Sequence, residues 1–103
     1  MPLIDNYHIL VYGSQQGYQS TRAQIALYTG TNCVGYIRFV DPGVAFPADN
    51  MNTYNQIVMH VPSAIFHGVM DMLRNEKPIN LYWAQNRGFL GTGALEPVGE
   101  GEA

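Results

Sequence analysis

Three histidines, His8, His60 and His67, are the residues best suited to act as a base or as metal ligands. His60 and His67 flank the point where a strand is expected to lead into a helix, so they could lie near one another. No pair of histidines has the ligand spacing typical of zinc enzymes or zinc fingers. We therefore predict no metal site, and interpret the three histidines as one strand residue and two surface residues.

Cys33 is the single cysteine and therefore has no partner for an internal disulfide, which favours a reducing compartment. No signature of a catalytic thiol surrounds it, and a lone strand cysteine usually serves as a small apolar side chain. The carboxylates Asp41, Asp49 and Asp71 form no recognisable acid–base pair. The sequence thus predicts no catalytic residue and no cofactor, and it favours a non-enzymatic role while leaving an enzymatic one open.

A set of outward-pointing strand residues is the better candidate for function. These residues should share the sheet face that points away from the helix: Arg22, Tyr28, Tyr36, Arg38, Gln56, His60 and Tyr82. Tyrosine and arginine are enriched at binding interfaces, although tyrosine also has a high propensity for strands in general. The face could pair with a second copy, hold a ligand under the loop 44–53, or stack single-stranded bases. The acidic net charge leaves the last reading as a minor one.

One amphipathic helix is expected to organise the fold. Ser63 is a predicted N-cap, and Pro78 requires the helix to end at Asn75 or Glu76. The apolar side chains fall within one arc of the helix: Ile65, Phe66, Val69, Met70, Met72 and Leu73. This arc predicts a helix that lies on a hydrophobic core.

Six strands are expected from alternating or continuous apolar patterns, at residues 6–12, 21–28, 33–40, 54–61, 79–84 and 89–95. The first is apolar on both faces and should be central in the sheet. The second and third should form a hairpin around 29–32, where Gly30 and Asn32 are able to adopt positive φ, and the last two should form one around 86–88. Gly35 predicts a bend, a bulge or a close neighbour.

Two loops separate these strands. The loop 13–20 lacks the residues of a phosphate-binding loop. The loop 44–53 should be pinned to the body by Phe46 and Met51.

The predicted fold is α+β in the order β-β-β-β-α-β-β. A strongly curved, mostly antiparallel sheet of about six strands should form a half-barrel packed on the amphipathic helix. A crossover through the helix could join 54–61 to 79–84 within this sheet. We predict one domain over residues 1–96 and an acidic, flexible tail over 97–103.

Composition narrows the functional classes. The chain has 103 residues and a net charge of −3, and only 13% of its residues are charged, which disfavours nucleic acid as a partner. No signal peptide or membrane span is evident. We predict a small cytoplasmic interaction module that self-associates, as a homodimer or other homo-oligomer, or binds another protein, through this face of tyrosine and arginine side chains. The alternative is a small-molecule-binding or enzymatic domain with a pocket between the 41–53 loop, the helix start and His60.

Overall fold

The computed structural model describes residues 3–14, 21–93 and 98, and the predicted α+β class and element order are confirmed. Two short strands, β1 and β5, are present in addition to the six expected strands. In chain order the elements are β1 (Leu3–Ile4), β2 (Asn6–Val11), β3 (Ala23–Thr29), β4 (Asn32–Val40), β5 (Asn50–Met51), β6 (Ile57–Pro62), a 3-10 turn (Ser63–Ile65), α1 (Phe66–Asn75), β7 (Ile79–Ala84) and β8 (Arg87–Thr92).

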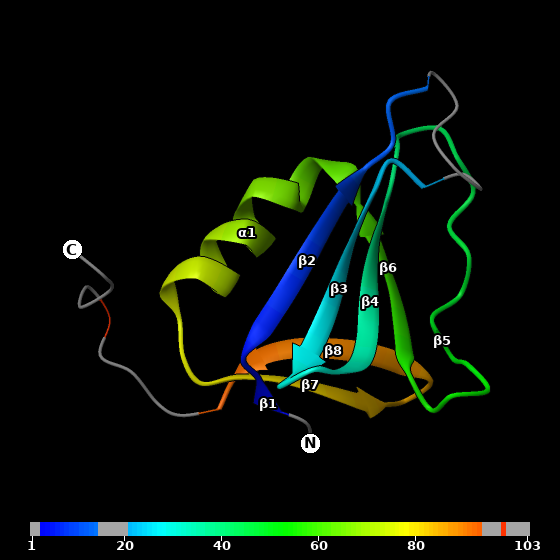
Figure 1. The fold of residues 1–103 in the computed structure, drawn as a ribbon. Coiled ribbons are helices and arrows are strands. Elements are labelled where there is room, and N and C mark those ends of the chain that lie inside the picture. The colour runs from blue at the N-terminus through cyan, green and yellow to red at the C-terminus, as the bar shows by residue number, and fades with distance from the viewer. Residues whose placement is uncertain (1–2, 15–20, 94–97, 99–103) are drawn as a thin grey trace.

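The strands form two sheets that are not closed into a barrel (Figure 1). The larger sheet has the order β2-β3-β4-β6-β5, and the smaller has the order β1-β7-β8. All neighbours are antiparallel except β4 and β6, which run parallel because the loop 41–56 carries the chain back between them. The expected crossover was wrong: α1 carries the chain from β6 to a different sheet.

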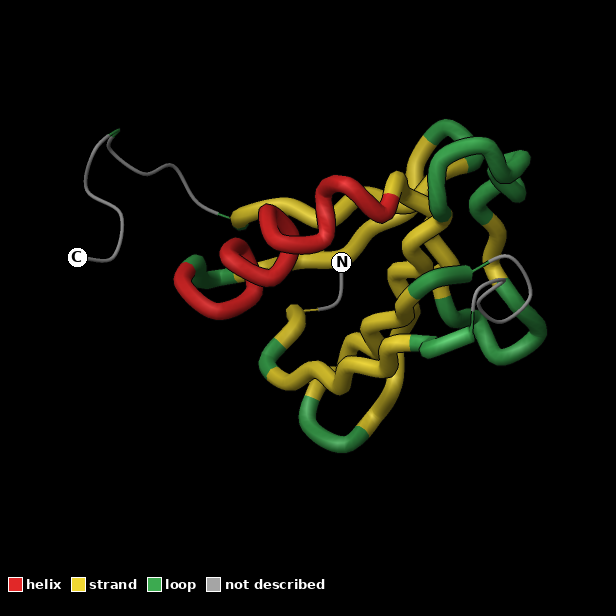
Figure 2. Tube along the Cα trace, turned by 90° about the horizontal axis from the view of Figure 1, so that it is seen from above, coloured by secondary structure: helices red, strands yellow, loops and turns green. Residues whose placement is uncertain are grey.

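The core lies between the inner face of the larger sheet, α1 and the smaller sheet (Figure 2). Alternate residues of β3 and β4 point into it, as predicted, and Ile25, Leu27, Ile37 and Phe39 are almost completely buried. The Phe66 ring of α1 meets the Phe39 ring edge-on, with 4.9 Å between centroids. Aromatic pairs prefer this geometry, which helps to fix the helix on the sheet.

The start of the helix differs from the prediction, whereas its end agrees. Ser63 does not cap α1: it opens a 3-10 turn, and α1 begins at Phe66 without a side-chain cap. A 3-10 turn has three residues per turn, so it rotates Ile65 away from the apolar arc expected for a continuous α-helix. Ile65 is therefore 44% exposed. The other five residues of the predicted apolar arc contact the core. Asn75 ends the helix, because Glu76 is already extended.

Strand β2 is an edge strand, so its predicted central position was wrong. Tyr7 and Ile9 pack on the core, whereas the outward Leu10 is 44% exposed; Val11, on the inner side at the end of the strand, is 66% exposed. An apolar pattern on both faces is typical of a strand covered on both sides, but only the inner face of β2 is covered.

Two of the loop predictions also need correction. Phe46 and Met51 do not pin the loop, because their side chains are 49% and 43% exposed. The turn of the last hairpin lies at Gln85 and Asn86, both with positive φ, one position before the predicted turn.

The first hairpin has positive φ at Gly30, as predicted, but Asn32 already belongs to β4. The predicted strand end at Leu95 lies outside the described residues, as do residues 15–20 of the first loop. The predicted tail does too, apart from exposed Val98.

Candidate binding surface

The register of the larger sheet brings several predicted residues onto its outer face. Arg38 pairs with His60 on one side and with Gln24 on the other, while Tyr36 pairs with Ala26. Tyr28 follows Ala26 by two positions and therefore points the same way. This face lies opposite α1, because the intervening residues of the same strands point into the core.

Arg22 and Gln56 lie near this face, but their side chains are engaged within the protein. The Arg22 Nε donates to Asp41 Oδ2 at 2.8 Å, and its Nη1 donates to the Tyr12 and Ser14 carbonyls. The Gln56 amide donates to the Cys33 carbonyl at 3.1 Å. Both residues therefore serve to hold loops against the sheet.

Tyr82 does not belong to the face. It lies on β7 of the smaller sheet, where its ring stacks on that of Phe89 with centroids 5.0 Å apart. The sequence could not separate Tyr82 from the others, because alternation along a strand does not say which sheet the strand joins.

Three of the predicted residues lie half-buried at the centre of the face, and we call Tyr28, Tyr36 and Arg38 the outer-face patch. The Arg38 Nε donates to Gln24 Oε1 at 3.0 Å, and its guanidinium lies 5.8 Å from the centre of the Tyr36 ring. A hydrogen bond with the Cys33 side chain raises the pKa of Tyr36, and partial burial adds to this effect. Tyr36 and Arg38 are thus oriented by contacts within the sheet itself.

Sequence reasoning missed that β2 contributes to this face. His8 pairs with Ala26 and Leu10 pairs with Gln24, so both side chains lie beside the outer-face patch, and both are exposed. Because the apolar pattern predicts a first strand covered on both sides, it does not predict that these side chains are exposed.

His60 lies at the edge of the face, with a side chain that is only 5% exposed. Asp49 holds it there: its Oδ1 accepts from the His60 backbone N–H at 2.8 Å, and its Oδ2 accepts from the Gly88 N–H at 3.0 Å. The His60 Nδ1 lies 3.6 Å from Asp49 Oδ1 and has no hydrogen-bond partner among the described residues. Burial lowers the pKa of His60, an effect that the nearby Asp49 carboxylate only partly offsets.

The lowered pKa of His60 predicts that the protein loses stability in mild acid. Between the unfolded pKa of about 6.5 and the lower folded pKa, the unfolded chain binds more protons, so the free energy of unfolding falls as the pH falls. His60→Gln should make this dependence shallower. Urea unfolding at about pH 7.5 and about pH 5.5 measures it.

His67→Gln, at an exposed position of α1, is the matched control for replacing a histidine by glutamine. Equal slopes for the wild type and His60→Gln would show that His60 does not cause the effect.

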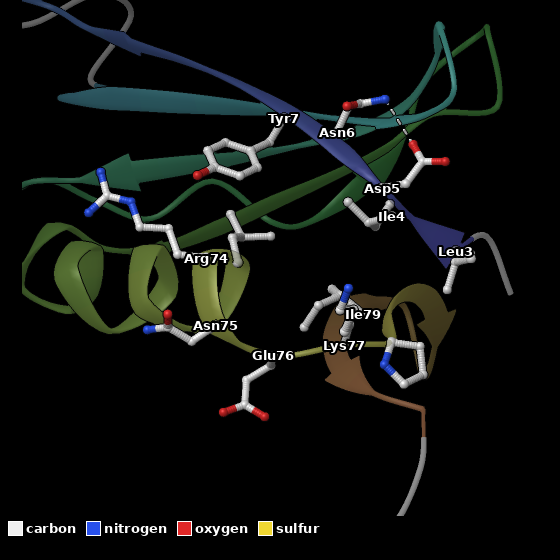
Figure 3. Close-up of a pocket in the computed structure, with 12 residues that line it drawn as sticks. Leu3, Ile4, Asp5, Asn6, Tyr7, Arg74, Asn75, Glu76, Lys77 and Ile79 are labelled. Carbon is white, nitrogen blue, oxygen red and sulfur yellow. Dashed lines mark hydrogen bonds between the residues drawn. The ribbon is translucent and has the colours of Figure 1, made fainter. Parts of the chain in front are cut away.

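The alternative pocket was expected between the 41–53 loop, the helix start and His60. There the structure has the Asp49 carboxylate bonded to two backbone N–H groups, which ties the loop to β6 and β8. A groove of about 560 Å³ lies instead at the other end of α1, between residues 3–7 and 73–79 (Figure 3).

Within residues 3–14 and 21–93, no three His, Cys, Asp or Glu side chains gather as they would around a metal ion. In the same part of the chain, no helix is long and apolar enough to cross a membrane. The chain matches none of the protein families, curated proteins or solved structures with which it was compared.

Proposed function

We propose that this chain is a non-enzymatic, cytoplasmic interaction module that binds a second copy of itself through the outer-face patch. The observation that carries the proposal is an arginine held beside a tyrosine on a sheet face whose outward strand positions carry no acidic or lysine side chain. The outward positions of β2, β3, β4 and β6 are occupied by Asn6, His8, Leu10, Gln24, Ala26, Tyr28, Cys33, Tyr36, Arg38, Val40, Val58, His60 and Pro62, of which Ala26, Val40 and Val58 are buried.

A second copy suits this face because the face contains both members of a favourable pair. A two-fold axis through the patch would place Arg38 of each copy against the tyrosines of the other. Surfaces that lack lysine and carboxylates are less strongly hydrated than charged ones, so covering them costs less. The Gln24 amide already orients Arg38, which reduces the side-chain entropy lost on association.

The cytoplasmic location is supported by the lone Cys33, which is a free thiol on the same face. A reducing compartment keeps such a thiol from joining two copies covalently.

Solution mass at high protein concentration tests the proposal. The wild type should have twice the mass of one chain. Tyr36→Asp or Arg38→Glu should weaken the dimer about thirty-fold or more, the loss expected for a residue at the centre of an interface. Arg87→Glu, in the exposed β7–β8 hairpin, should leave the mass unchanged.

Circular dichroism of each variant should show the wild-type fold. A wild type that stays monomeric at high concentration would refute the proposal. So would a dimer that both patch variants leave intact.

A further inference from the structure

The groove at the end of α1 is separate from the outer-face patch. One wall is formed by residues 3–7 of β1 and β2, and the other by residues 73–79, from the last turn of α1 to the start of β7 (Figure 3). Its volume of about 560 Å³ lies in the range of small-molecule sites, about 300–1,000 Å³.

The base of the groove is apolar. Ile4 and Ile79, paired across β1 and β7, are 8% and 3% exposed and belong to the core. Leu73 and Tyr7 extend this surface along the wall, and Leu3 at the mouth is 46% exposed. A ligand with an apolar body would therefore remove exposed hydrocarbon from water.

The rim of the groove carries two cations, Arg74 and Lys77, besides the carboxylates of Asp5 and Glu76. Arg74 and Lys77 are two of the five basic residues of the chain, and both line the groove. Within the described part of the chain, neither side chain makes an ion pair or a hydrogen bond. In Figure 3 the Lys77 side chain extends toward the space between Ile4 and Ile79. Two cations are thus available to an anionic group.

The carboxylates near the groove do not neutralise this rim. Asp5 Oδ1 accepts from the Gly30 N–H at 2.7 Å and from the Asn6 amide at 3.1 Å, which directs it toward the β3–β4 turn. The Glu76 side chain points away from the groove in Figure 3. Together with the carbonyl end of α1, these two charges still disfavour a doubly charged ligand.

We infer that the groove binds a small amphiphile with a single carboxylate head and an unbranched apolar chain. The chain would lie along Ile4, Leu73 and Ile79, and the head would meet Arg74, whose guanidinium extends toward Tyr7 in Figure 3. A guanidinium can hold a carboxylate through two parallel hydrogen bonds, and Lys77 would add a second positive charge nearer the apolar base. The inference does not depend on self-association, because the groove and the outer-face patch share no residue.

Amide chemical shifts during a titration with decanoate, kept below its micelle concentration, test the inference. Decanol, of equal chain length and uncharged, is the matched ligand. Shifts should change mainly at residues 3–7 and 73–79. Decanoate should bind at least about ten-fold tighter than decanol, the factor that corresponds to one charge-assisted contact.

The double variant Arg74→Gln/Lys77→Gln should lose this preference and keep the affinity for decanol. Arg87→Gln, in the hairpin away from the groove, should behave as the wild type. Equal affinity of the wild type for the two ligands would overturn the inference. Shift changes centred on the outer-face patch, or none at millimolar decanoate, would overturn it as well.

Discussion

Gly35→Ala is expected to lower the free energy of unfolding by about 3 kcal/mol, at the upper end of the usual cost of overpacking a core. A Cβ at this position would lie 2.6 Å from the carbonyl oxygen of Ile57 and 2.6 Å from Cδ2 of Leu81. The first atom is backbone of the neighbouring parallel strand β6, and Leu81 is completely buried. Neither can move without disturbing the junction of the two sheets.

Gly68→Ala is the matched control for this change. Gly68 lies on the exposed side of α1, and a Cβ there would meet nothing within 4 Å. Alanine should therefore stabilise the helix by about 0.5–1 kcal/mol. Urea unfolding followed by circular dichroism measures both variants, and a Gly35→Ala protein within about 1 kcal/mol of the wild type would contradict the packing argument.

Asp49→Ala is the second substitution that we expect to be strongly destabilising, and it should lower the free energy of unfolding by about 3 kcal/mol. The substitution removes the acceptor from two backbone N–H groups, those of His60 and Gly88, and each unsatisfied donor costs about 1–3 kcal/mol when it is buried. It also detaches the loop 41–56 from β6 and β8. Gly88 is buried against Met59 and Ile57, so water cannot easily replace the lost acceptor.

Hydrogen exchange shows which part of the protein is destabilised by Asp49→Ala. The amides of His60 and Gly88 should exchange faster in Asp49→Ala, whereas those of the β3–β4 hairpin should change only with global stability. Asp71→Ala is the control: its carboxylate lies on the exposed helix face and, among the described residues, accepts from Asn75 alone, so the cost should stay within about 0.5 kcal/mol. Equal costs for the two variants would exclude Asp49 as an anchor.

Local features of the fold could be predicted from the sequence because they depend on neighbouring residues. The end of α1 follows from the backbone restriction that Pro78 imposes, and the inward positions of Ile25, Ile37 and Leu81 follow from the two-residue repeat of a strand. A close neighbour at Gly35 was among the possibilities predicted from the sequence, but the sequence could not identify the backbone of Ile57 as that neighbour. In the candidate surface, alternation along β3 and β4 was enough to place Tyr28, Tyr36 and Arg38 on one face.

The remaining features depend on contacts between distant segments. Whether β2 lies at an edge, whether Tyr82 joins the outer face, and whether β6 pairs in parallel with β4 are decided by strand order, on which side-chain periodicity carries no information. Asp49 looked like an ordinary loop carboxylate, and its role exists only because β6 and β8 present N–H groups to it. The groove likewise exists only where residues 3–7 meet residues 73–79, nearly seventy positions later in the chain.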